Sequence, residues 1–142
     1  MKNQNYGNHR KWVIMYHLIS FIAILVLVIG SIRYLINASD DNFYLASLIV
    51  LISILLLFIF FFSRIFALKA QDRAIKAEES LRHFALTGKL LSPNLKMRQI
   101  VALRFASDEE FVALAEKAEK DGMSENDIKK AIKNWRGDYY RV

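Results

Sequence analysis

The sequence predicts an all-α membrane protein: a two-helix transmembrane hairpin whose second helix extends into the cytosol, followed by a small three-helix C-terminal bundle. Residues 43–62 are twenty residues without a charge, and about twenty apolar residues let a helix cross the hydrocarbon core of a bilayer. An amphipathic pattern then continues without proline or glycine as far as Gly88, which predicts one long helix. Three short helical patterns in the last fifty residues predict the bundle.

Composition and charge predict a membrane protein and exclude several other classes of protein. The 142 residues are 54% hydrophobic, and the part outside the apolar runs is too short for a large enzyme domain. The absence of cysteine excludes a disulfide framework and a thiolate metal site. The net charge of +6 comes mainly from cations that flank the spans: Lys2, Arg10, Lys11, Arg64, Lys69, Arg73 and Lys76. Positively charged flanks favour the cytoplasmic side, so both termini are expected there, and nucleic acid is an unlikely partner.

The N-terminal segment and first span follow from this topology. Residues 1–11 are polar and are expected to form a loosely ordered cytoplasmic segment. Residues 12–36 form the first predicted transmembrane helix, with aromatic Trp12 at its start. His17, one turn inside, is interpreted as an interfacial histidine, and a proton relay or a haem ligand shared with His9 is the less favoured alternative.

An external turn at residues 37–42, NASDDN, is expected to place the two spans side by side and antiparallel. Arg33, near the outer end of the first span, is interpreted as an anchor that reaches the membrane surface. Residues 43–63 form the second predicted transmembrane helix. They contain no charged residue, so no proton path or ion-pair site is expected within this span.

Residues 64–87 are predicted to form a cytosolic helical extension with an apolar seam. Its members recur at alternating spacings of three and four, as in a heptad repeat. The candidate helix-packing seam consists of Ala67, Ala70, Ala74, Ala77, Leu81 and Phe84. Its partner could be a second copy of the chain, the N-terminal segment or the protein's own C-terminal helices. Alanines bury little area, so a dimer held by this seam alone is expected to be weak.

Residues 92–142 are predicted to form the cytosolic three-helix bundle. Its second helix is expected to begin at Ser107 with a capping box to Glu110, and to end at Gly122. The third is expected to begin at Ser124 and to bury one helical face: Ile128, Ala131, Ile132 and Trp135. A bundle of about fifty residues buries too little apolar surface to be stable alone, so it is expected to pack against another element or protein.

The C-terminal tail is aromatic and basic. Its candidate interaction residues are Trp135, Arg136, Tyr139, Tyr140 and Arg141. Such residues can stack nucleic-acid bases or dock a partner. The favoured interpretation is structural, in which the tail completes the bundle.

Three separated motifs carry a resemblance to a known family. They are FALKAQDRAI at residues 66–75, IVALRFASDEE at residues 100–110 and DIKKAIKNWRGDYYRV at residues 127–142, with QNYGNH near the start. The chain resembles a family of small bacterial membrane proteins with two spans, a domain of unknown function whose members are sometimes labelled transporter permeases. The resemblance implies a bacterial inner-membrane protein and supplies no activity or catalytic residue. Two spans alone cannot form an alternating-access path.

These observations lead to a hypothesis about function. The sequence lacks the motifs of common hydrolases and nucleotide-binding enzymes, so no enzymatic activity, cofactor or metal is expected. The leading hypothesis is a membrane-anchored interaction module or accessory subunit of a larger membrane complex. The alternative is a homo-oligomeric membrane scaffold or pore. A tail that tethers nucleic acid is less favoured, because the last fifty residues contain roughly as many acids as bases.

Overall fold

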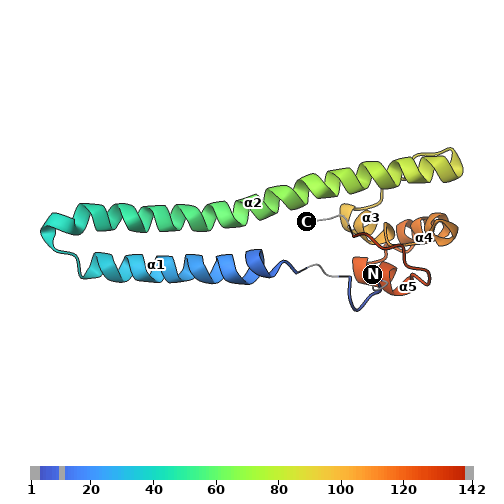
Figure 1. The fold of residues 1–142 in the computed structure, drawn as a ribbon. Coiled ribbons are helices and arrows are strands. Elements are labelled where there is room, and N and C mark those ends of the chain that lie inside the picture. Colours follow the sequence, from blue (N-terminus) through green and yellow to red (C-terminus); the bar gives the residue numbers. More distant parts are fainter. Residues whose placement is uncertain (1–3, 10–11, 140–142) are drawn as a thin grey trace. The chain divides into compact units, whose positions relative to one another are not determined.

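A computed structural model of the chain describes residues 4–9 and 12–139. The elements are η1 (Met15–Ser20), α1 (Phe21–Ile36), α2 (Asp40–Thr87), α3 (Met97–Leu103), α4 (Asp108–Lys120) and α5 (Glu125–Ala131) (Figure 1). The described residues contain no β-strand, only an isolated antiparallel bridge between Ala106 and Trp135. The predicted all-α class is therefore confirmed.

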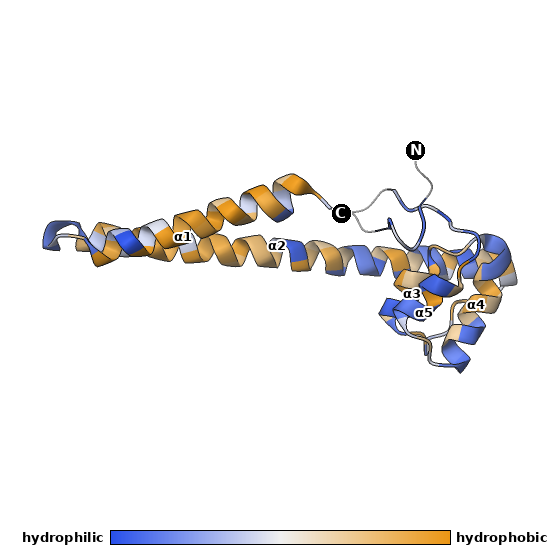
Figure 2. Cartoon of the chain, turned by 90° about the horizontal axis from the view of Figure 1, so that it is seen from below, coloured by the Kyte–Doolittle hydropathy of each residue, from blue (hydrophilic) through white to orange (hydrophobic). Residues whose placement is uncertain are grey.

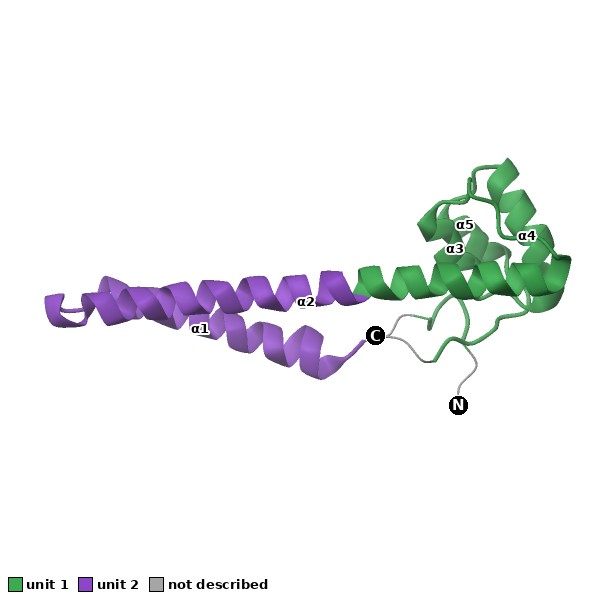
Figure 3. Ribbon diagram, turned by 90° about the horizontal axis from the view of Figure 1, so that it is seen from above, with its two compact units in different colours: residues 1–10, 68–142 green, residues 11–67 purple. Residues whose placement is uncertain are grey.

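The chain forms two compact units, shown in Figure 3. The hairpin unit comprises Lys11–Ala67. The bundle unit comprises Met1–Arg10 together with Leu68–Val142. Helix α2 is continuous from Asp40 to Thr87, as the absence of helix-breaking residues predicts, and contributes its first part to the hairpin unit and its last part to the bundle unit.

The hairpin unit presents apolar side chains on its outside. Helix α1 and the first part of α2 are strongly hydrophobic, whereas the rest of α2 is mixed (Figure 2). Within the most apolar stretches of Met15–Ile36 and Asp40–Thr87, only 6% and 11% of the residues are buried. An apolar helix in the core of a soluble protein is mostly buried instead. Both helices are long and apolar enough to cross a membrane.

Small and polar residues join the two helices of the hairpin. The side-chain oxygens of Ser31 and Ser53 lie 3.0 Å apart in a buried hydrogen bond, and Ala46, two turns before Ser53 on α2, is fully buried. Near the other end, the Tyr16 hydroxyl donates to the carbonyl of Phe60, and the two rings stack with centroids 4.5 Å apart. Residues early in one helix meet residues late in the other, so α1 and the first part of α2 run antiparallel as predicted.

Replacement of Ser53 by alanine tests the buried hydroxyl pair. Ser31 and Ser53 each also lie within hydrogen-bond distance of a carbonyl three residues earlier, so the remaining hydroxyl keeps a partner. We therefore expect Ser53→Ala to destabilise the hairpin by only about 0.6 kcal/mol, the average for such bonds between membrane helices. Unfolding of the full chain in mixed micelles measures the effect. Ser47→Ala is the control, because the Ser47 hydroxyl donates to the Tyr44 carbonyl of its own helix.

The two ends of the hairpin differ in detail from the prediction. The first helix opens with six residues of π-helix, η1, where the Ser20 hydroxyl donates to the Met15 carbonyl five residues earlier. Helix α2 begins at Asp40, inside the predicted turn at residues 37–42. Asp40 and Asp41 lie in the first turn of the helix, where carboxylates interact favourably with the helix dipole. The connecting turn is therefore shorter than predicted.

The core of the bundle unit includes a residue of α2. The largest fully buried apolar side chains are Phe105, Phe111, Ile100, Leu103 and Ile128. Ile75 of α2, 6% exposed, packs in the same cluster. The three short helices therefore do not form a separate domain, because their core is completed by the last part of α2.

Two helix caps follow the predicted pattern and one does not. The Ser124 hydroxyl accepts the amide of Asp127, and Gly122, with φ of 60°, ends α4 as expected. Ser107, however, makes no side-chain cap bond. Its predicted partner Glu110 instead accepts the backbone amides of Lys133 and Asn134 at 3.2 and 3.0 Å. The predicted capping box at Ser107 is therefore wrong, because Glu110 receives the amides of the chain that leaves α5.

The predicted third helix is also too long. Helix α5 ends at Ala131, which is exposed, and Ile132 already has extended backbone angles. Trp135 lies on an extended segment that pairs with Ala106. The helical spacing of Trp135 with Ile128 was therefore misleading, since backbone pairing rather than a helical face places the indole against the core.

Glu119 of α4 binds the loop between α2 and α3 through two hydrogen bonds. Its carboxylate accepts the Ser92 hydroxyl at 2.6 Å and the Asn94 side-chain amide at 2.8 Å. These two hydrogen bonds lower the pKa of Glu119 below its ordinary value of 4.5. A carboxyl whose pKa is lowered by folding stabilises the fold above its ordinary pKa, and this contribution disappears as the pH falls through the lowered value.

We expect Glu119→Gln to lower the thermal unfolding midpoint of the bundle unit slightly at pH 7. The amide keeps the shape of the carboxylate but accepts weaker hydrogen bonds, because it carries no charge. The difference from the wild type should shrink well below pH 4.5, where the wild-type carboxyl is protonated too. Thermal melts at pH 7 and pH 3 measure it, and an equal difference at both pH values would contradict the assignment.

Candidate functional site

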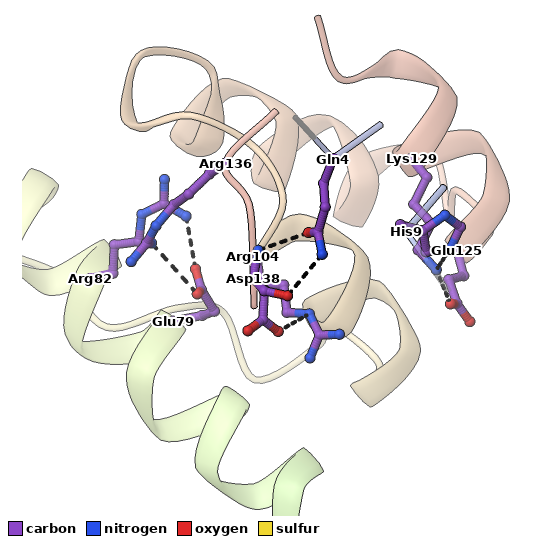
Figure 4. A network of polar contacts seen from close by, with 9 residues as sticks. All are labelled: Gln4, His9, Glu79, Arg82, Arg104, Glu125, Lys129, Arg136 and Asp138. Carbon is purple, nitrogen blue, oxygen red and sulfur yellow. Dashed lines mark hydrogen bonds and ion pairs between the residues drawn. The ribbon is translucent and has the colours of Figure 1, made fainter. Parts of the chain in front are cut away.

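The described part of the N-terminal segment is anchored to the bundle unit. The Gln4 side-chain amide donates to the Asp138 carbonyl at 3.0 Å and accepts the Asp138 amide at 2.9 Å (Figure 4). Beside this pair, the Asp138 carboxylate lies 3.3 Å from Nε of the buried Arg104. The Lys130 ammonium lies 5.9 Å from the centroid of the Tyr6 ring, in a cation–π contact. For residues 4–9 the expected loose order is therefore wrong: they are held by contacts more than 100 residues away in sequence.

His9 packs against aromatic side chains of the same unit. Its ring is 5.8 Å from Phe105 and 5.9 Å from Trp135, centroid to centroid. Nδ1 lies 2.8 Å from the Tyr6 carbonyl, and Nε2 lies 3.2 Å from the Lys129 ammonium. Since the ammonium can only donate, Nε2 accepts and Nδ1 carries the proton. His17 belongs to the hairpin unit, where it contacts Trp12 and Tyr16.

Arg82 is the centre of a second polar network, which joins α2 to the loop before α4. Its guanidinium, 10% exposed, lies 3.0 Å from the Glu79 carboxylate and 2.6 Å from that of Asp108. It also donates to the Ala106 carbonyl at 2.7 Å and lies 4.3 Å above the centre of the Phe111 ring. Glu79 is itself only 5% exposed. A planar guanidinium with several donors can satisfy all these groups at once, so Arg82 fixes α2 against the bundle.

The C-terminal tail is tied to this network and to the bundle. The Arg136 amide donates to the Phe105 carbonyl at 2.8 Å, and its guanidinium lies 3.9 Å from Glu79 (Figure 4). Trp135 packs with its ring 5.1 Å from that of Phe105. Tyr139 is 49% exposed. Tyr140 and Arg141 lie outside the described residues, so the interaction role of the tail stays a prediction.

The seam residues of α2 face away from these contacts. Ala70, Ala74 and Ala77 are exposed, Leu81 is 67% exposed and Phe84 49%. Ala67, at the end of the hairpin unit, is half-buried. The protein's own C-terminal helices therefore do not use the seam, and contact α2 at Ile75, Glu79 and Arg82 instead. Whether the seam packs against another chain stays a prediction.

An open pocket lies between the N-terminal segment and the tail. Its volume is about 530 Å³, and its lining combines two cations and two aromatic rings with polar groups: Gln4, Asn5, Ser107, Lys133, Asn134, Trp135, Arg136, Gly137 and Tyr139. Within residues 4–9 and 12–139, no group of three or more His, Cys, Asp or Glu side chains is placed to hold a metal ion.

Sequence reasoning missed the residues that hold the bundle unit together. Ile75, Glu79 and Arg82 are spaced by four and three, which is the signal of a packed helical face. Two of the three residues are charged, so in the sequence this helix face looks like one that is exposed to solvent. Gln4 carries no periodic signal at all, because its contact with Asp138 depends on the tertiary fold.

The comparisons with known proteins agree with the predicted resemblance at the level of the family. No curated protein and no solved structure matches the chain. One family model matches over residues 1–142, and its description is a family of unknown function, DUF6526. The match covers every element described above, from the N-terminal segment to the tail. The chain belongs to this family of unknown function, DUF6526.

Proposed function

We propose that this protein is a membrane-anchored helical interaction module that serves as an accessory subunit of a bacterial inner-membrane complex. One observation carries the proposal. The segment that precedes the apolar hairpin and the helix that follows it belong to the same compact bundle unit. Both ends of the hairpin therefore connect along the chain to one polar helical unit, and the apolar residues of the hairpin are largely exposed.

The exposed apolar surface supports insertion into a bilayer. A soluble protein rarely exposes contiguous apolar patches larger than a few hundred Å². The apolar side chains of α1 and the first part of α2 are largely exposed over the whole hairpin unit. Lipid is the partner that covers such a surface on all sides of a helix pair. Because both ends of the hairpin connect along the chain to one compact unit, we expect both ends to leave the membrane on the same side, and the flanking cations favour the cytoplasmic side.

The bundle unit is suited to holding a partner rather than to chemistry. Its buried charges serve structural contacts: Glu79 pairs with Arg82, and Lys129 pairs with Glu125 and contacts His9. Around them, the α2 seam and the tail offer exposed aromatic and aliphatic side chains to a partner. We expect the chain itself to have no catalytic activity and no resident cofactor.

Copurification from native membranes tests this function. The tagged full-length protein is extracted in a mild detergent, and its partners are identified by mass spectrometry with stoichiometry. We expect one partner near a one-to-one ratio, and its loss in Arg82→Ala, which releases the bundle from α2. Lys76→Ala, an exposed charge of the same helix, is the matched control and should keep the partner. Recovery of the chain without any other protein would contradict the accessory role.

A homo-oligomeric membrane scaffold or pore component is the second candidate. The exposure of Leu81 and Phe84 beside Ala74 and Ala77 favours it, because these residues form a face that the chain's own bundle leaves uncovered. Recovery of the chain with itself alone in the copurification would support this candidate.

A further inference from the structure

Two opposite faces of α2 have different roles in the bundle unit. Ile75, Glu79 and Arg82 face the bundle core and its ion pairs. Ala77, Leu81 and Phe84 each follow one of these residues by two positions. Two positions are about 200° around an α-helix, so the second set lies on the opposite side. That side keeps Leu81 67% and Phe84 49% exposed.

The charges beside this exposed face are complementary in one arrangement. With Ala67, Ala74 and Leu81 at heptad position a and Ala70, Ala77 and Phe84 at d, Arg73 occupies position g and Glu78 position e. In a parallel coiled coil, a residue at g meets the residue at e five positions later in the partner helix, and such pairs set partner choice and orientation. In that arrangement Arg73 would lie beside Glu78 of a second copy. Among the described residues, neither side chain forms an ion pair within its own chain.

We propose that two copies of this chain associate in parallel along the α2 seam, with Arg73 of each copy paired to Glu78 of the other. This inference rests on the proposed membrane anchoring, because two copies inserted in the same sense present their α2 helices in parallel. An antiparallel pairing opposes g with g and e with e, and so gains nothing from Arg73 and Glu78. The bundle occupies the opposite face of α2 and remains docked in the dimer.

Membrane confinement compensates for the small area of the seam. Four of its six members are alanines, and each buries little apolar surface in a dimer. Two copies in one bilayer, however, are already concentrated and oriented, which removes much of the entropy lost on association. The dimer is therefore expected in membranes, and in detergent its amount should fall as the protein is diluted.

Disulfide crosslinking of the full chain in native membranes tests the dimer. The sequence has no cysteine, so each introduced cysteine is the only thiol. Ala77→Cys, at a central d position, should form crosslinked dimers under mild oxidation. Lys76 is the neighbouring residue and is also exposed, but its side chain points away from the seam. Lys76→Cys should therefore give at least fivefold less crosslink.

Charge reversal tests the ion pair in the same dimer. Arg73→Glu in the Ala77→Cys chain should lower crosslinking about fivefold, because the symmetric dimer contains the pair twice. Adding Glu78→Arg should restore it.

Three results within the series of cysteine and charge variants would overturn the proposal. They are equal crosslinking at residues 76 and 77, no crosslink at either Ala70→Cys or Ala77→Cys, and no rescue by the double charge reversal. A crosslink from residue 77 to a different protein would also overturn it and would place a heterologous partner on the seam. Alkaline washing of the same membranes tests the anchoring separately: chain that stays in the pellet without crosslinking contradicts the dimer alone, whereas chain released into the wash contradicts the anchoring.

Discussion

Arg82→Ala is expected to destabilise the bundle unit by about 3–5 kcal/mol, the range observed when one partner of a buried ion pair is removed. The substitution leaves the Glu79 carboxylate, 5% exposed, with only the Arg136 guanidinium at 3.9 Å, and it removes the donor to the Ala106 carbonyl. Arg82→Lys should recover only part of this loss, because an ammonium cannot reproduce the planar fork. Fluorescence of Trp135 during thermal unfolding, in a Trp12→Phe background, measures the change.

A paired replacement separates a buried-charge effect from general damage to α2. Replacing both partners of a buried ion pair with apolar residues of similar size is often neutral or stabilising. Glu79→Leu combined with Arg82→Met should therefore recover most of the stability lost in Arg82→Ala. Lys76→Ala, an exposed cation on the same helix, should change stability by less than about 0.5 kcal/mol. Equal losses in Lys76→Ala and Arg82→Ala would contradict the central place of Arg82.

Phe105→Ala is expected to have an effect of similar size, about 3–5 kcal/mol, the usual range for a buried phenylalanine. Phe105 is fully buried and its ring contacts His9, Trp135 and the Arg104 guanidinium. The cavity should therefore release the N-terminal segment and the tail together. Hydrogen–deuterium exchange of the full-length protein in detergent measures this as faster exchange in both segments at once.

Leu90→Ala is the matched control for the phenylalanine. Leu90 is 71% exposed, so its truncation removes few contacts and should leave exchange in both segments unchanged. If Phe105→Ala increases exchange in the tail but not in residues 4–9, the contact between His9 and Phe105 does not hold the N-terminal segment.

Features encoded in local patterns could be predicted from the sequence. The continuity of α2 follows from the lack of proline or glycine up to Gly88, and the buried faces of α4 follow from helical spacing, with Phe111, Leu114, Ala115 and Ala118 all in the core. The end of α4, two residues before Gly122, is equally local, because this glycine adopts a positive φ that other residues rarely tolerate.

The long-range polar contacts could not be predicted in this way. Nothing in the spacing of Gln4 indicates that its amide pairs with Asp138, and an i,i+3 pair such as Glu79 and Arg82 resembles a solvated helix face. Glu110 shows the same limit: its position three residues after Ser107 suggests a local cap, yet it receives amides from residues 133 and 134. Such a side chain can hydrogen-bond either to a neighbour in sequence or to a distant residue, and which of the two it binds depends on the fold of the whole unit.

Labelling of single cysteines from both sides of a membrane tests the account most directly. Asp41→Cys lies at the start of α2 and Lys120→Cys at the end of α4, and both residues are exposed. In intact spheroplasts, a membrane-impermeant maleimide should label residue 41 and leave residue 120 unlabelled until the membrane is opened. That result would establish a hairpin that crosses the membrane twice, with the bundle unit on the cytoplasmic side. Equal labelling of both residues from outside, or of neither until the membrane is opened, would contradict it.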